Sequence, residues 1–193
     1  TATVTVLSTP TISKAFSPAT VDASQASTMT FTLGNPNSTA LTNANFTDTL
    51  TGFSVAAPAT LGGTCAGVTS SPPLPLVAGA TSLNLTVPSL AASPATCTIT
   101  IPVSAISAGT YTNTTSGVTT VETGATAGSP SNTATLTVIM LPLQVTKTPN
   151  VFTATPGSTI NYVIGYGNPN VYTWFQSVEI TDPVPPYTTF QSA

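Results

Sequence analysis

Two stretches of the sequence place a lysine among alternating apolar residues, and they constrain the fold more than any other feature. Lys14 and Lys147 are the only basic residues of the chain. Alternate side chains of a β-strand share a face, so a strand TISKAFS puts Lys14 on the same face as Ile12 and Phe16. Lys147 has the same setting in LQVTK. Burying an unpaired ammonium group is costly, so each lysine needs a partner.

Each lysine is followed at nearly the same distance by an aspartate in an apolar strand pattern. Asp48 in NFTDTL comes 34 residues after Lys14, and Asp182 in VEITDPV comes 35 residues after Lys147. This doubled spacing predicts two copies of one domain, each with a lysine and an aspartate paired in its core.

Other phrases return with the same offset. The segment TATVTVLST at residues 1–9 returns as TATLTVI from residue 133, and the turn GNPN at residues 34–37 returns at residues 167–170. A period near 133 residues is long enough for a whole domain, so the pattern predicts domains in tandem rather than a solenoid of small units.

The repeat sets the expected domain boundaries. Residues 1–10 are predicted to be the last strand of a preceding repeat, residues 11–140 one complete repeat, and residues 141–193 the opening half of the next. That half would leave an open apolar face, which we expect either later residues or a neighbouring copy to cover, with the strand at 1–9 as a candidate donor.

The complete repeat reads as a series of short strands. Apolar residues alternate with Thr or Ser, no segment has a helical period, and Gly, Pro and Asn cluster between the runs. Seven to nine strands at this spacing predict an all-β fold of immunoglobulin-like antiparallel β-sandwich domains in tandem; a barrel is the alternative. The inward residues are predicted to be Met29, Phe31, Leu33, Phe46, Asp48, Leu50, Leu83, Leu85, Val87, Cys97, Ile99, Ile101, Val103, Ala134, Leu136 and Val138.

Composition narrows the class of partner. Charged residues make up 4% of the chain and the net charge is −3, so the surface offers no attraction to nucleic acid or anionic membranes. Apolar runs such as VIMLPL are too short to span a bilayer, so this segment is not expected to be transmembrane.

The quoted motifs resemble a known family. TISKAFSPATV, STMTFTLGNPN and ALTNANFTDTL, with the later pieces GTCAG, ATCTITIPV and AGTYTNTTSGV, resemble the threonine-rich "domain of unknown function eleven" repeats of bacterial surface proteins and their close relatives. The resemblance implies an extracellular or cell-surface location and an immunoglobulin-like structural module.

Cys65 and Cys97 are the only cysteines. In an extracellular setting two cysteines in one domain are expected to form a disulfide, and two buried thiols are the alternative. Two cysteines and no histidine are too few ligands for zinc, so no metal or other cofactor is expected.

The lysine pair allows a covalent alternative. Asn113 is in phase with Tyr111 on its strand, and Asn132 is in phase with Ala134, so either asparagine could face Lys14. A lysine, an acid and an asparagine in an apolar pocket are the parts of an intramolecular isopeptide bond, as in the collagen-adhesin-like modules that this array resembles. A plain ion pair and an exposed lysine are the alternatives.

Asp48 would catalyse that bond. Asn113 is the preferred acceptor over Asn132 because the family resemblance includes its segment GTYTNTT. The second copy would use Lys147 and Asp182, with its asparagine after residue 193 or on another chain.

The functional expectation is therefore structural. With no His, no Arg and no phosphate-binding or calcium-binding motif, the chain is not expected to be an enzyme acting on an external substrate. We expect a repeat of a secreted stalk or extracellular filament whose partners are neighbouring repeats or copies of itself. The alternative is an adhesin module that binds glycan, protein or ice through threonine-rich strand faces.

Overall fold

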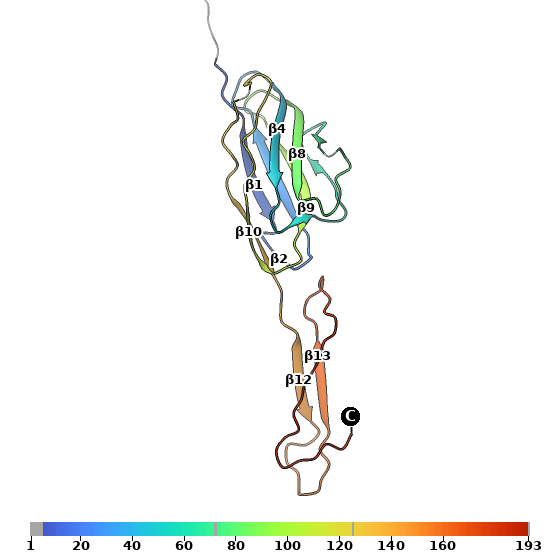
Figure 1. Ribbon diagram of the computed structural model, residues 1–193. Coiled ribbons are helices and arrows are strands. Elements are labelled where there is room, and N and C mark those ends of the chain that lie inside the picture. Colours follow the sequence, from blue (N-terminus) through green and yellow to red (C-terminus); the bar gives the residue numbers. More distant parts are fainter. Residues whose placement is uncertain (1–5, 72, 125, 193) are drawn as a thin grey trace, which may run out of the picture. The chain divides into compact units, whose positions relative to one another are not determined.

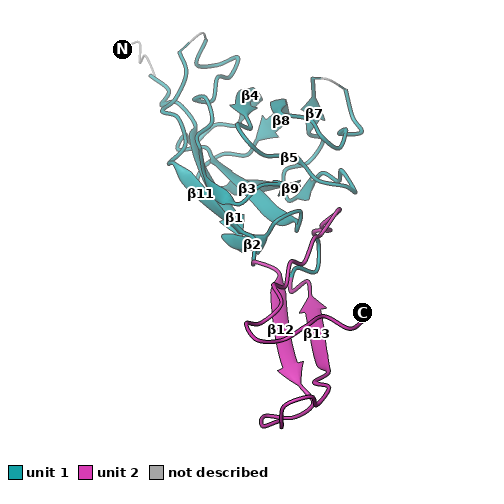
Figure 2. Cartoon of the chain, turned by 60° about the horizontal axis from the view of Figure 1, so that its bottom comes forward, with its two compact units in different colours: residues 1–141, 170–172 teal, residues 142–169, 173–193 magenta. Residues whose placement is uncertain are grey.

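The chain forms two compact units built from β-strands. The computed structural model describes residues 6–71, 73–124 and 126–192. Unit 1 comprises Thr1–Leu141 with Asn170–Tyr172, and unit 2 comprises Pro142–Pro169 with Thr173–Ala193 (Figure 2). No helix occurs among the described residues.

The first sheet of unit 1 has the order β1-β3-β9-β5, and β6 also pairs with β9. All its pairs are antiparallel. Its strands are β1 (Thr11–Ser17), β3 (Ser27–Gly34), β5 (Ser54–Val55), β6 (Gly62–Gly63) and β9 (Thr96–Ser104). Alternating apolar and Thr or Ser residues give each long strand one buried face and one face toward solvent.

The facing layer is made of two ladders, β4-β8-β7 and β10-β11-β2. Its strands are β2 (Thr20–Asp22), β4 (Leu41–Thr49), β7 (Thr69–Ser70), β8 (Ser82–Leu90), β10 (Gly109–Asn113) and β11 (Ala134–Ile139). Main-chain hydrogen bonds between Asn45 and Thr119 join the segment after β10 to β4. The chain changes sheets between β1 and β2, because β2 pairs with β11 in parallel.

This arrangement is an immunoglobulin-like β-sandwich, which confirms the predicted fold class (Figure 1). The predicted inward residues lie in its core, except that Cys97 is only partly buried. Phe31 of β3 and Phe46 of β4 meet between the sheets, with ring centroids 5.1 Å apart. Burying a side chain of this size contributes roughly 1.5–3 kcal/mol, so the two-sheet core is the main source of stability.

Unit 2 contains one antiparallel pair, β12 (Gln144–Pro149) with β13 (Tyr162–Gly167). Its register matches that of β1 with β3 when 133 is added to each number: Thr11 lies opposite Gly34, and Gln144 lies opposite Gly167. Within the described part of unit 2 this pair is the whole of the sheet. Apolar side chains of the ladder are therefore exposed, as in Val145 at 55% and Tyr166 at 77%.

The expected strand at residues 1–9 falls partly outside the described residues, which begin at residue 6. Residues 6–10 belong to no ladder. The proposed role of this segment as a strand donor stays a prediction, as do the domain boundaries of the repeat.

Cys65 and Cys97 form the expected disulfide. Cys97 lies on β9, and Cys65 lies in the loop that follows β6. The bond encloses a loop of 32 residues that includes β7 and β8. It therefore links the loop after β6 covalently to β9, a central strand of the first sheet.

We expect the disulfide to be a large part of the net stability. Closing a loop of this length restricts the unfolded chain and stabilises the fold by roughly 3–4 kcal/mol on the chain-entropy model. Denaturant unfolding with and without reductant measures the loss, and the double variant Cys65→Ser with Cys97→Ser should not respond to reductant. Two free thiols per chain in denatured, unreduced protein would contradict the prediction.

Candidate cross-linking site

Lys14 and Asp48 meet in the centre of unit 1 from opposite sheets. Lys14 is on β1 and Asp48 is on β4, and each occupies an inward position of its strand, as the alternation predicts. Lys14 Nζ donates a hydrogen bond to Asp48 Oδ2, and both side chains have no exposed surface. The chain thus places one of its two cations in the core beside one of its few acids.

Aromatic rings surround the ammonium group. Lys14 Nζ lies 5.0 Å from the ring centroid of Phe31 and 5.7 Å from that of Phe16. Contact with ring faces offsets part of the lost hydration. Because the side chains of Lys14 and Asp48 have no exposed surface, the site is much less polar than the solvated surface on which most lysines lie.

Burial shifts both pKa values toward the neutral forms. Desolvation lowers the pKa of Lys14, and the attraction and hydrogen bond of Asp48 only partly oppose this. Desolvation likewise raises the pKa of Asp48, and the charge and hydrogen bond of Lys14, together with the neighbouring Asn113 side chain, only partly oppose this. Transfer of the shared proton from the amine to the carboxylate is therefore much easier here than in water.

Asn113 is the third member of the site. It ends β10, is 6% exposed, and donates from Nδ2 to the carbonyl oxygen of Thr49 at 2.7 Å. Asp48 Oδ1 and Asn113 Oδ1 are buried and have no hydrogen-bond partner among the described residues. An unpaired buried acceptor costs about 1–3 kcal/mol. A protonated Asp48 could donate to the Asn113 carbonyl, which would satisfy that oxygen and polarise the amide.

Asn132, the alternative acceptor, is engaged elsewhere. Its Oδ1 accepts from the main-chain N–H of Lys14 at 2.9 Å, and its Nδ2 donates to the carbonyl oxygen of Lys14 at 3.0 Å. The side chain is directed at the backbone of Lys14 and the residue is exposed. The geometry therefore favours Asn113 as the residue that completes the buried site.

Unit 2 contains the second predicted pair in a different environment. Lys147 Nζ lies 2.7 Å from Asp182 Oδ2 and 4.3 Å from the ring centroid of Tyr162. The two side chains are 32% and 37% exposed, so the expectation of a buried second pair is wrong for the described structure. The reason is that the described residues supply no second sheet over this ladder.

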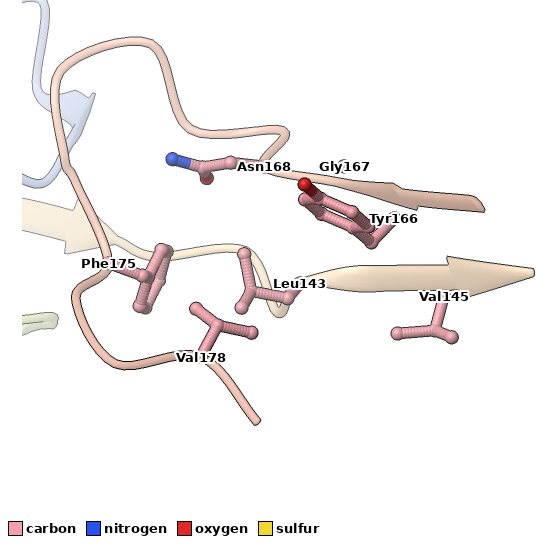
Figure 3. Close-up of a pocket in the computed structure, with 7 residues that line it drawn as sticks. All are labelled: Leu143, Val145, Tyr166, Gly167, Asn168, Phe175 and Val178. Atoms are coloured by element: carbon pink, nitrogen blue, oxygen red, sulfur yellow. The ribbon is translucent and has the colours of Figure 1, made fainter. Parts of the chain in front are cut away.

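A cavity of about 220 Å³ in unit 2 follows from the same absence of a covering layer. Figure 3 shows the side chains of Leu143, Phe175 and Val178 close together among the lining residues. By the repeat, the lining residues Val145 and Tyr166 correspond to Ile12 and Leu33, which are buried in unit 1. The cavity is thus the uncovered counterpart of a core, and only Tyr166 and Asn168 among its lining residues have a polar side-chain group.

Among the described residues, no group of three or more His, Cys, Asp or Glu side chains is placed to hold a metal ion. None of the secondary-structure elements in this part of the chain is a helix long and apolar enough to cross a bilayer.

Comparison with known families places most of unit 1 in one of them. Residues 10–138 match the model of a domain of unknown function, DUF7933. The chain belongs to the DUF7933 family. The match runs from the residue before β1 to Val138 near the end of β11, and it includes Lys14, Asp48, Asn113 and the disulfide. The resemblance to the "domain of unknown function eleven" repeats stays a prediction.

Solved structures give weak likenesses. A bacterial hydrophobin, BslA, is 12% identical with a TM-score of 0.45; the alignment covers 70% of this chain and 97% of that one. BcpA with the substitution D312A, the major pilin subunit of Bacillus cereus, is 11% identical with a TM-score of 0.42; 83% of this chain and 54% of that one are covered. Scores of this size carry no argument about function. No curated protein matches the sequence.

We expect the buried pair to make stability depend on pH in two windows. Because the folded-state pKa of Asp48 is raised, the folded protein holds that proton more tightly, and stability falls as pH rises from 3.8 toward the raised value. Because the folded-state pKa of Lys14 is lowered, the unfolded chain keeps the lysine proton longer, and stability increases with pH on the approach to 10.5.

The measurement is the free energy of unfolding by denaturant across pH, made on the variant Asn113→Ala. In this variant Lys14 has a free amine, because the asparagine with which it could form an isopeptide bond is gone. The variant Lys147→Met is the matched control, since its pair is partly exposed, and it should leave both windows in place in the Asn113→Ala background. A flat profile in both windows would show that the pair does not titrate as argued.

Proposed function

We propose that this chain is a structural module of a secreted or cell-surface bacterial protein, and that its sandwich repeats build a stalk or extracellular filament. The observation that carries the proposal is that the reactive side chains of unit 1 are paired with one another inside the domain. Lys14, Asp48 and the two cysteines all join one part of unit 1 to another. Such internal bracing suits a module that bears load, and it leaves these groups no role toward an external substrate.

The brace at Lys14 is proposed to be covalent. The proton shared by Lys14 and Asp48 moves to the carboxylate, which leaves a neutral amine and a carboxylic acid. Lys14 Nζ attacks Cγ of Asn113 while the acid hydrogen-bonds to Asn113 Oδ1. Asp48 then passes a proton from Nζ to Nδ2, the Cγ–Nδ2 bond breaks, and ammonia leaves. One Nζ–Cγ amide bond replaces the side-chain amide. The proton that Asp48 took from the Lys14 ammonium leaves with the ammonia as ammonium, which returns Asp48 to the carboxylate.

Two features of the site support this step. The unpaired oxygens of Asp48 and Asn113 are the two atoms that the mechanism joins by a hydrogen bond. The low polarity around Lys14 stabilises the neutral amine that has to attack. The reaction happens once per molecule, so it is a maturation step and not an enzymatic activity.

The bond would join β1 to β10 across the whole domain. The segment between Lys14 and Asn113 contains β2 to β9 and the disulfide loop. A pulling force applied at the two ends of the domain would then pass through the covalent link, and the enclosed strands would stay folded. This is the property that a stalk or filament module needs.

A second candidate function is adhesion through the outer face of the first sheet. Cross-strand neighbours there are hydroxyl residues in register: Ser13 lies opposite Thr32, which lies opposite Thr98, and Thr30 lies opposite Thr100. The rows form an uncharged grid of hydroxyl and methyl groups that could bind glycan, protein or ice. The substitution Thr30→Lys should abolish such binding without affecting the cross-link.

The cross-link predicts a defined loss of mass. Intact-mass measurement of the wild type should give the sequence mass less one ammonia, after the hydrogens lost in the disulfide are counted. Lys14→Ala, Asp48→Ala and Asn113→Ala should each restore the ammonia, because each removes the nucleophile, the proton carrier or the acceptor. Tandem mass spectrometry should identify a peptide that joins Lys14 to Asn113.

Asn132→Ala is the matched control, since it removes a nearby asparagine that is bonded to the Lys14 backbone and should leave the ammonia loss unchanged. A wild-type mass equal to that of the disulfide-bonded sequence would mean that the ion pair is the final state. In a cross-linked wild type, the stability rise near pH 10.5 should be absent, because an acylated lysine does not titrate.

A further inference from the structure

The second asparagine of each GNPN turn holds one residue of an extended segment by both of its main-chain groups. Asn37 Oδ1 accepts from the N–H of Ser8 at 2.8 Å, and Asn37 Nδ2 donates to the carbonyl oxygen of Ser8 at 2.8 Å. The same two bonds join Asn170 to Leu141, also at 2.8 Å each, and both of these residues belong to unit 1. We call each pair of bonds a clasp.

The two clasps agree in position as well as in geometry. In each, the asparagine follows its partner by 29 residues, and each partner lies just ahead of a first strand, β1 or β12. Both asparagines are nearly buried, Asn37 at 8% exposure and Asn170 at 6%. A buried amide that uses both its donor and its acceptor on one residue fixes that residue as a strand partner would.

The first clasp shows how the turn presents its amide. Asn35 Oδ1 accepts from the main-chain N–H of Asn37 at 2.9 Å and from Asn37 Nδ2 at 3.0 Å. Asn35 Nδ2 in turn donates to the carbonyl oxygens of Thr39 and Ala91. Pro36 between the two asparagines restricts the backbone of the turn. Asn37 is therefore oriented before its partner segment arrives.

The recognised residues share no side-chain chemistry, because one is Ser8 and the other is Leu141. Only the peptide groups are contacted, so any residue other than proline could occupy the site. We propose that the GNPN turn is a binding site for an extended main chain, and that its natural occupant is the connecting segment that enters each repeat. The role of this segment as the connection between repeats rests on the proposed function. The hydrogen bonds of the clasps do not depend on that proposal.

The consequence concerns the connecting segment. A residue held by two hydrogen bonds cannot turn freely, and Pro142 restricts Leu141 further by disfavouring helical backbone angles. Each entry segment is thereby kept extended and in a fixed register with the turn that follows the second strand of its ladder.

Residue-level amide hydrogen exchange on the full chain tests the proposal. Wild-type Leu141 and Ser8 should show protected N–H groups. Asn170→Ala should speed exchange at Leu141 by about tenfold or more and leave Ser8 unchanged, and Asn37→Ala should do the reverse. Asn170→Asp keeps an acceptor and loses the donor, so it should retain part of the protection at Leu141.

Asn161→Ala is the matched control, because Asn161 is an exposed asparagine of unit 2 outside both clasps, and neither amide should respond to it. Unprotected amides at Leu141 and Ser8 in the wild type would overturn the proposal. So would equal acceleration at Phe31 and Ile99 in the clasp variants, since that would mean global destabilisation. The readout does not depend on the ammonia loss, so the clasps and the cross-link can fail separately.

Discussion

Unit 1 depends on an ammonium and a carboxylate held together where no water reaches them. Two such groups are stable in a core only if the surroundings recover most of their lost hydration, and replacing them by apolar residues would often be neutral or better. Here the recovery comes from several elements at once: β1 carries the lysine, β4 carries the aspartate, Phe16 and Phe31 face the cation, and Asn113 approaches from β10. The two sheets therefore have to close in one register for the pair to exist.

Lys14 is fixed at both of its ends. Its side chain is bonded to Asp48, and both of its main-chain groups are bonded to Asn132 at the start of the last strand. The same use of an asparagine amide on a single peptide recurs at Ser8 and Leu141. With so few charged residues, the chain relies on neutral amides for the positioning that ion pairs provide in more highly charged proteins. Hydrogen bonds made by neutral amide side chains do not depend on pH and depend little on salt.

The two units provide an internal comparison. Their first ladders have the same register and similar lysine–aspartate pairs, yet the pair in unit 1 has no exposed side-chain surface and the pair in unit 2 is about one-third exposed. The difference lies in the facing sheet, which unit 1 has and the described part of unit 2 does not. Burial, and with it the chemistry proposed for Lys14, is thus a product of the complete sandwich and not of the strand that carries the lysine.

The sequence by itself determined the strands and the pairs. Period-two alternation placed Lys14 and Asp48 on inward faces, and the doubled spacing matched each lysine to its aspartate before any contact was known. Alternation alone could not choose between Asn113 and Asn132, because both lie in phase with apolar neighbours. The tertiary structure places Asn113 at the end of β10 beside Asp48, whereas Asn132, just before β11, is bonded to the Lys14 backbone; which asparagine is the acceptor stays a prediction. The sequence did not predict the clasp of Asn37 for a related reason. The GNPN turn was visible as a repeated motif, but the residue that Asn37 holds lies 29 positions away. A long-range contact to main-chain groups leaves no pattern in the sequence of side chains. What the sequence encodes locally is the face on which a residue lies; which residues meet there is set by how the sheets close.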